Sequence, residues 1–313
     1  MLKTKDDLKS LINSFNEATL YWKDNLNKSV NSSNVDNPIN ELIKLISLIK
    51  AHTTKVGIIF KPENVEKDPS AAYNTLEKLS QTLVLLISVI GQLKQKELSK
   101  IYYSEIINQS KSLIVANYEF SSELSLDGRL ISVGKIWNIC DSLTSLLENN
   151  NLGFLSFKIN QTLSILDDGW DEFVSWCDDP IGQEDPFEIS EEDEDDDYEY
   201  MEISELKEYV NYWLNKIKLV KLLISSFKKS LPKSTTGDEI DQIYNLQSGI
   251  INLIDSFIMD IMLIRNTDLE IDKCTNQITI NSIKLAKLAS SIHKDTKKSQ
   301  WYISWITKYD NSD

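Results

Sequence analysis

The sequence of 313 residues contains few of the residues that usually interrupt helices, with only nine glycines and six prolines. The glycines are scattered singly, and neither GxGxxG nor GxxxxGK[S/T] occurs, which argues against a phosphate-binding enzyme. The prolines all fall between stretches of periodic apolar residues, at Pro38, Pro62, Pro69, Pro180, Pro186 and Pro232. Because proline breaks a helix interior, this placement predicts long helices with proline only at their boundaries.

Cysteine and histidine are scarce as well. Cys140, Cys177 and Cys274 lie far apart and form no CxxC pair, which favours a reducing compartment over a disulfide framework or a cysteine metal site. His52 lies on an apolar helical stripe and is interpreted as structural, and His293 lies near a predicted helix end, where the helix dipole favours a cation. No nucleophile motif accompanies either histidine. We therefore expect a non-enzymatic protein with no catalytic residue, metal site or cofactor.

Long apolar runs and basic clusters are also missing. The longest apolar run, Leu83–Ile87, is far shorter than the roughly 20 residues that span a membrane. The first residues, Met1–Asp7, carry acids where a signal peptide would be apolar. The densest basic spots are the doublets Lys228–Lys229 and Lys297–Lys298, which form no stripe with interleaved aromatic residues. We expect no membrane and no direct nucleic-acid partner.

Apolar residues recur at helical spacing almost throughout the sequence. The clearest stripe runs for six turns from Leu206 to Phe227, with lysines off the stripe. We see no alternating pattern typical of strands, so the predicted fold class is all-α, with one or more bundles of about ten long helices. The predicted helices span 4–28, 38–60, 69–95, 97–124, 130–149, 153–177, 203–230, 238–265, 268–294 and 299–310.

Several helix starts are marked by capping residues. Thr236 and Thr267 are each followed three residues later by a glutamate, a pattern that predicts a capping box. Asn37 and Asp68 each precede a proline, which predicts a cap followed by proline at the first helical position.

Acidic residues are concentrated in one segment. Between Asp167 and Glu208 there are 20 acidic residues and one basic residue, which gives −19, whereas the remaining 32 basic and 28 acidic residues give +4. Like charges at this density repel, and little apolar surface offsets the cost of ordering. We predict an acidic disordered linker at 178–201, between an N-terminal helical bundle at 1–177 and a C-terminal helical part at 202–313. Periodicity leaves open whether the two parts share one core.

Aromatic residues accompany the acidic segment. Trp170, Phe173 and Trp176 close the preceding helix and are interpreted as core residues. An acidic tract with aromatic anchors is typical of disordered segments that bind basic, partly apolar partner surfaces. Ser190 precedes a run of acids, so we hypothesise that acidophilic kinases phosphorylate it, which phosphopeptide mapping would test. The candidate partner-binding and regulatory residues are Phe187, Ser190, Glu191, Glu192, Asp193, Glu194, Asp195, Asp196, Asp197, Tyr198 and Tyr200.

The order of these elements resembles that of the cyclin-D-binding proteins, also called the GCIP or Maid-like family, in which an acidic stretch separates two helical parts. The local similarities lie at Leu130–Cys140, at Cys177–Pro180, which leads into the acidic run, at Ile280–Leu285, and at Ser299–Trp301. The resemblance implies a regulator of the cytoplasm and nucleus that binds or sequesters cell-cycle and transcription partners, namely D-type cyclins and helix-loop-helix factors.

The charge asymmetry supports a second reading beside that resemblance. An acidic-tract chaperone or decoy would bind basic proteins such as histones through the segment itself. The charge difference also predicts a salt-sensitive autoinhibitory contact between Glu191–Asp197 and the lysine-bearing face of the helix at 203–230. Deletion of residues 184–200 separates binding by the segment from binding by the helical body.

Overall fold

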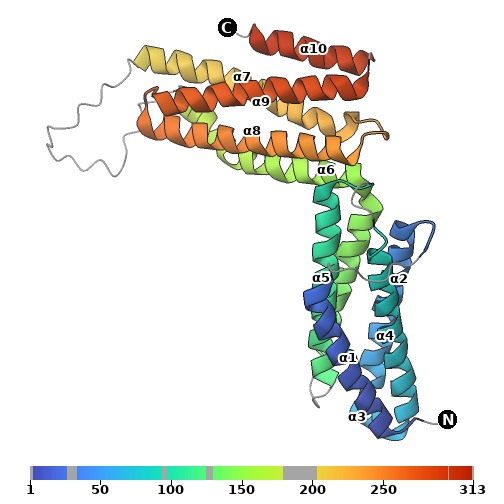
Figure 1. Cartoon of the computed structure of the whole chain (residues 1–313). Helices are drawn as coiled ribbons and strands as arrows, with labels where there is room; N and C mark the ends of the chain where they lie inside the picture. Colours follow the sequence, from blue (N-terminus) through green and yellow to red (C-terminus); the bar gives the residue numbers. More distant parts are fainter. Residues whose placement is uncertain are drawn as a thin grey trace, which may run out of the picture. The chain divides into compact units, whose positions relative to one another are not determined.

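The structure is a computed structural model that describes residues 3–26, 34–93, 97–124, 130–178, 203–294 and 296–311. Within these residues every regular element is an α-helix, ten in number, so the predicted all-α class is confirmed (Figure 1). Internal contacts divide the chain into two compact units, Met1–Asn150 and Asn151–Asp313.

The first unit contains α1 (Lys5–Asn25), α2 (Pro38–Ile59), the short α3 (Pro62–Lys67), α4 (Pro69–Ile90), α5 (Lys100–Leu124) and the first half of α6 (Ser132–Asp178). The predicted caps are present, because the side chains of Asn37 and Asp68 accept hydrogen bonds from the amides of Asn40 and Ala71. The short α3 was not predicted. Its six residues begin with Pro62, end just before Pro69 and contribute no buried side chain, so they leave no periodic signal.

The helices of the first unit pack around a core of leucine and isoleucine. α2 lies against α4, and α1 lies against both α4 and α5. Polar contacts tie α6 to two of these helices: Lys50 of α2 pairs with Asp141, and the Tyr102 hydroxyl of α5 donates to the carbonyls of Leu146 and Leu147. Burial raises the pKa of Tyr102 to about 12, so its hydroxyl keeps the proton that it donates.

Asn150 interrupts α6 with φ of 55° and ψ of −175°. Residues other than glycine adopt this backbone conformation only at a cost in free energy. The sequence prediction placed a break at this point, between helices at 130–149 and 153–177. The second half of α6 belongs to the second unit, so the contacts divide the chain at 150, whereas the predicted parts were 1–177 and 202–313. The predicted linker at 178–201 lies, except for Asp178, outside the described residues.

Asn150→Gly is expected to raise the free energy of unfolding by about 1 kcal/mol, because glycine removes the steric strain at positive φ and ψ near 180°. Urea denaturation of the full chain measures the change. Asn149→Gly is the matched control, because Asn149 is helical and glycine there should lower stability by about 1 kcal/mol. Equal losses in both variants would contradict the assigned strain.

The second unit packs the rest of α6 with α7 (Ile203–Ser230), α8 (Gly237–Ile264), α9 (Leu269–His293) and α10 (Lys297–Asp310). α9 lies against both α8 and α10, and α7 lies against α10 (Figure 1). The Lys216 side chain is buried between α7 and α10, with its ammonium 4.8 Å from the centres of the Tyr212 and Tyr309 rings. Phe173 and Trp176 are buried, as predicted for core residues. Trp170, predicted with them, is only half-buried, and its ring lies under the ammonium of Lys221.

Two cap predictions for this unit have different outcomes. Thr236 and Glu239 form the predicted capping box at the start of α8. The capping box predicted at Thr267 is wrong, because Asp268 is the N-cap of α9 and its carboxylate accepts hydrogen bonds from the amides of Glu270 and Ile271. Asp268 directly follows Thr267 and competes with it for the same backbone amides, and aspartate is at least as good an N-cap as threonine.

α8 is the one helix of the described residues that is long and apolar enough, by length and composition, to cross a membrane. Asp241, Gln247 and Asp255 interrupt the apolar residues of α8, so this helix contains no long uninterrupted apolar run. Core helices of soluble proteins pass the same test. In the structure the apolar stripe of α8 is buried. The Cys274 thiol of α9 donates a hydrogen bond to the backbone carbonyl of Leu253 in α8.

Candidate functional site

The predicted partner-binding residues lie outside the described residues. This applies to Phe187, Ser190, the acidic run Glu191–Asp197, Tyr198 and Tyr200. The hypotheses of Ser190 phosphorylation and of a contact between Glu191–Asp197 and α7 therefore stay predictions. The candidate sites described below lie on the helices of the first unit.

The surface between α2 and α6 exposes a tryptophan. The Trp137 indole Nε1 donates to Thr54 Oγ1 at 3.1 Å, and 38% of the residue stays exposed. One turn beyond Thr54 on α2, the side chain of Ile58 is also exposed, and Ile131 precedes α6 with 77% exposure. We call Ile58, Ile131 and Trp137 the Trp137 surface.

Gly134 lies on the exposed side of α6 between Ile131 and Trp137. A methyl group at this position would have no neighbour within 4 Å, so packing inside the first unit does not require glycine. Gly57 of α2 differs, because a methyl group there would lie 3.4 Å from Val133 Cγ2, in van der Waals contact. The missing side chain at Gly134 leaves the backbone of α6 uncovered between two exposed apolar residues.

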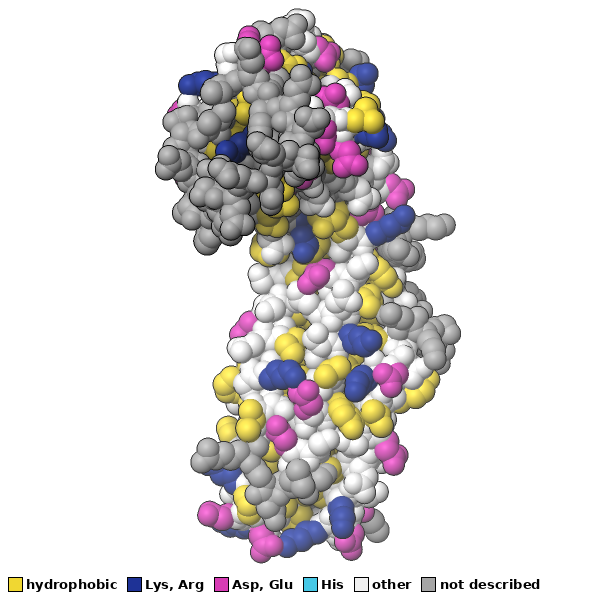
Figure 2. Space-filling view, turned by 90° about the vertical axis from the view of Figure 1, so that its left-hand side faces the viewer, with side chains coloured by type: hydrophobic (Ala, Val, Ile, Leu, Met, Phe, Trp, Pro, Cys, Tyr) yellow, Lys and Arg dark blue, Asp and Glu magenta, His cyan; other side chains and the backbone are white. Residues whose placement is uncertain are grey.

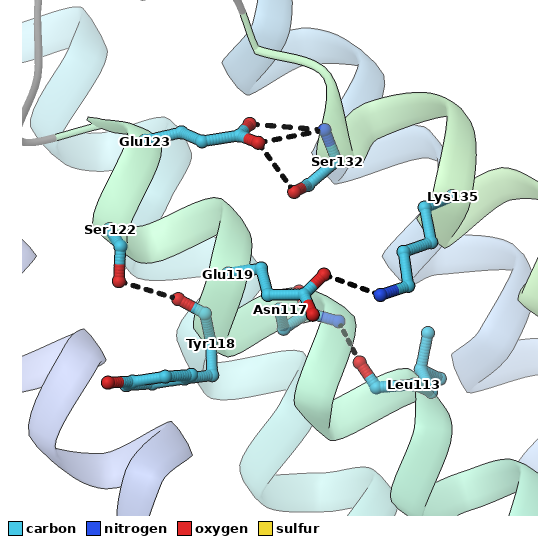
Figure 3. A network of polar contacts seen from close by, with 8 residues as sticks. All are labelled: Leu113, Asn117, Tyr118, Glu119, Ser122, Glu123, Ser132 and Lys135. Carbon is cyan, nitrogen blue, oxygen red and sulfur yellow. Dashed lines mark hydrogen bonds and ion pairs between the residues drawn. The ribbon is translucent and has the colours of Figure 1, made fainter.

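A polar network holds the start of α6 against the end of α5 (Figure 3). The Glu123 carboxylate accepts hydrogen bonds from the Ser132 amide at 3.1 Å and from the Ser132 hydroxyl at 2.7 Å. One turn earlier on α5, Glu119 pairs with Lys135 at 2.6 Å, with both side chains about half exposed. These contacts fix the first turn of α6, which carries Gly134 and leads directly to Trp137.

Glu123→Ala is expected to lower the free energy of unfolding by about 1–3 kcal/mol, because Ser132 is buried and would lose a charged acceptor for two donors. Chemical denaturation monitored by circular dichroism measures the change. Glu119→Ala removes an exposed ion pair from the same helix and should cost less than about 1 kcal/mol. If both variants lose the same stability, Glu123 does not cap α6 in the way described.

A cavity of about 510 Å³ opens at one end of the first unit, between α1, α3 and the end of α5. Its lining combines apolar residues, among them Leu8, Ile12 and Phe60, with the charged side chains of Lys5, Glu66 and Glu123. At its rim Lys5 Nζ lies 2.7 Å from Glu66 Oε1, and this hydrogen bond holds the pKa of Glu66 below its usual value. Glu66 therefore stays ionised at neutral pH and cannot act as a general acid, so the cavity suits an apolar side chain better than proton-transfer chemistry.

Other reactive groups of the described chain are poorly placed for catalysis. Burial raises the pKa of the Cys140 and Cys177 thiols to about 12, which keeps them protonated and unreactive at neutral pH. No group of three or more histidine, cysteine or acidic side chains with metal-binding geometry occurs among the described residues. His293 differs from its prediction, because burial and Lys298 lower its pKa despite its place at the end of α9.

Figure 2 shows one face of the molecule, on which the apolar side chains of the first unit stand singly or in small groups among charged ones. Single apolar residues on a surface are normal, whereas binding sites cluster them. Among the described residues of the first unit, the Trp137 surface is the one built around an exposed tryptophan, so it is the candidate considered further.

Residues 41–179 match the family model described as "Grap2 and cyclin-D-interacting, N-terminal". This region is GCIP-like. The GCIP-like region begins in α2 and ends after the last residue of α6, so it includes the whole Trp137 surface. The resemblance predicted from the short motifs is thereby confirmed for this part of the chain.

Two relatives from yeasts are similar along most of the chain. The uncharacterized protein YLR287C of Saccharomyces cerevisiae is 27% identical over 344 aligned positions, which cover 97% of this chain and 97% of that protein. The uncharacterized protein C22E12.18 of Schizosaccharomyces pombe is 21% identical over 292 positions, which cover 88% of this chain and 85% of that protein.

Trp137 stood in the motif Leu130–Cys140 that carried the family resemblance, yet its role as an exposed residue was missed. The signal was present in the helical spacing. Ile136, Cys140 and Leu143 form the buried stripe of α6, which leaves Trp137 beside the stripe rather than on it. A large aromatic residue at such a position either covers a neighbouring helix or binds a partner.

Proposed function

We propose that this protein is a non-enzymatic regulator that binds other proteins through the Trp137 surface. The observation that carries the proposal is the exposed, hydrogen-bonded Trp137 within the region that matches a cyclin-D-interacting family. By that similarity the partners are D-type cyclins or helix-loop-helix regulators, which the protein binds or sequesters in the cytoplasm and nucleus. Neither a membrane nor a nucleic acid is part of the proposed mechanism.

Trp137 has the features of a binding hot spot. Tryptophan is enriched among residues whose truncation costs a complex 2 kcal/mol or more, because its large rigid ring buries much area at little entropic cost. The bond from its indole to Thr54 holds the ring in one orientation before any partner arrives. An ordered ring pays less entropy on binding than a mobile one.

Trp137→Ala is expected to weaken binding to a purified D-type cyclin about 30-fold, the equivalent of a 2 kcal/mol hot spot. Titration calorimetry with the full chain measures the affinity. Trp301→Ala on α10 is the matched control, because Trp301 is exposed to nearly the same extent, 39% against 38%. Equal affinity of wild type and the Trp137 variant would overturn the proposed surface, and absence of binding by wild type would overturn the proposed partner.

The charge of the acidic segment favours a second candidate function, a chaperone or decoy for basic proteins such as histones. The segment between Asp167 and Glu208 carries −19 against +4 for the rest of the chain. Deletion of residues 184–200 should then abolish a steeply salt-dependent binding of histones. If the deleted chain still binds its partners, the helical body is the site and the chaperone function is wrong.

A further inference from the structure

The seam between α2 and α4 carries a second surface, separate from the Trp137 surface. Contacts at two levels fix its antiparallel register. Val35, just before α2, exchanges hydrogen bonds with the Gln92 side chain, just after α4, and His52 of α2 lies close enough to Lys78 of α4 to feel its charge. Residues between these levels, including Leu48 and Leu85, therefore lie on neighbouring turns of the two helices.

Apolar and basic side chains share this seam, with the two leucines toward the Val35 end and the lysines at and beyond the level of His52. Leu48 lies one turn before His52 on α2, and Leu85 lies two turns after Lys78 on α4, with 46% and 54% of their surfaces exposed. Lys55 is exposed on α2, three residues after His52. We call Leu48, His52, Lys55, Lys78 and Leu85 the α2–α4 face.

The charge on the α2–α4 face is positive. The carboxylate beside it, Glu41, is already paired with Lys44 at 3.1 Å. Lys55 and Lys78 both act on His52 and lower its pKa, together with burial, which is the largest cause. The charges that act on this histidine are those of Lys55 and Lys78. Of the neighbouring acids, Asp141 of α6 pairs with Lys50, and Glu77 precedes Lys78 on α4.

His52 is half-buried, and its Nδ1 has no hydrogen-bond partner among the described residues. A buried polar atom without a partner costs free energy, so His52 is the least well satisfied titratable group of this face. A histidine between two lysines is deprotonated at neutral pH and becomes easier to protonate once an anion neutralises those lysines.

We propose that the α2–α4 face binds an acidic amphipathic helix of a partner protein, and that binding places a proton on His52. Two exposed leucines on adjacent antiparallel helices form an apolar strip for the apolar side of such a helix. Glutamate or aspartate flanking that side would meet Lys55 and Lys78. The charge complementarity sets this partner apart from a basic helix, which the same lysines would repel.

Proton uptake follows from the charges. In the free protein the two lysines disfavour the imidazolium, whereas carboxylates of the bound helix favour it. The complex therefore binds more protons than the separate molecules, and affinity rises as the pH falls from 7.5 to 5.5. A single proton limits the gain to about tenfold for each pH unit.

The test uses two fluorescein-labelled helical peptides of about 20 residues, both with leucines at helical spacing. One has glutamates beside the leucines, and the other has lysines at the same positions. Fluorescence anisotropy with the full chain at low salt should show at least tenfold tighter binding of the glutamate peptide. The double variant Lys55→Glu/Lys78→Glu should lose that preference, and His52→Asn should bind with no pH dependence between 7.5 and 5.5.

Three further outcomes decide the proposal. The control variant Lys9→Glu/Lys111→Glu makes the same change of net charge at two exposed lysines of α1 and α5, and should bind the glutamate peptide like wild type. Equal loss in both double variants would reduce the effect to net charge and overturn the site. An unchanged pH dependence in His52→Asn would overturn the proton uptake. Trp137→Ala should bind the peptide normally, so this face stands or fails independently of the Trp137 surface.

Discussion

Replacing Phe257 by alanine is expected to lower the free energy of unfolding of the second unit by about 3–5 kcal/mol. The Phe257 ring is fully buried at the meeting point of three helices. Its centre lies 5.5 Å from that of Trp213, 6.5 Å from that of Tyr209 and 6.3 Å from that of Phe173, which come from α7 and α6. Removing the ring opens a cavity that these rigid aromatic neighbours cannot close.

Denaturant unfolding followed by near-ultraviolet circular dichroism measures this loss, because the affected aromatic rings dominate that signal. Met259→Ala, two residues along the same helix, is the matched control, since 61% of Met259 is exposed and its loss should change stability by less than about 0.5 kcal/mol. A loss below about 1 kcal/mol for the phenylalanine variant would mean that the second unit is not organised around this ring.

Acidification from pH 7.5 to 5.5 is expected to destabilise the protein through its two histidines. Burial lowers the pKa of both His52 and His293 from 6.5 in the folded state, and neighbouring lysines lower it further. The unfolded chain then binds more protons than the folded chain in this range. Stability is fully present above the unfolded value of 6.5 and is lost as the pH falls through the folded values.

The slope cannot exceed about 1.4 kcal/mol for each pH unit and each histidine. Urea midpoints at pH 7.5, 6.5 and 5.5 measure it. His52→Asn and His293→Asn should each flatten the dependence, and the double variant should remove it in this range. Asp7 and Glu66 also have lowered pKa values, but both titrate below the range of this experiment. A wild-type midpoint that does not fall on acidification would contradict the assigned burial of both imidazoles.

The helix positions were predicted from apolar periodicity and capping residues. The prediction was accurate where these signals were long and unambiguous. α7 spans Ile203–Ser230, as predicted, because one apolar stripe runs along its whole length and the chain changes composition at both ends. α3 was missed because six residues are too few for a periodic pattern. The capping box at Thr267 was wrong because two adjacent residues can each cap the same helix.

The binding surfaces depended on contacts that a sequence does not carry. Trp137 lies beside the apolar stripe of α6, but the sequence does not say that α2 brings Thr54 to its indole. His52 is half-buried, as its place on an apolar stripe predicted, yet the lysine that opposes it on α4 is 26 positions away. Residues Glu191–Asp197, on which the sequence prediction relied for binding, lie outside the described residues.

The sequence by itself determined the helical class, most helix boundaries and the resemblance to cyclin-D-interacting proteins, because periodicity, caps and short motifs are local properties of the chain. Only the tertiary structure decided that the two units divide at Asn150 within α6, and which apolar and basic residues share an exposed seam. The physical reason is that a helical stripe shows which side of a helix is apolar, whereas the partner of that side is chosen by packing among all the helices together.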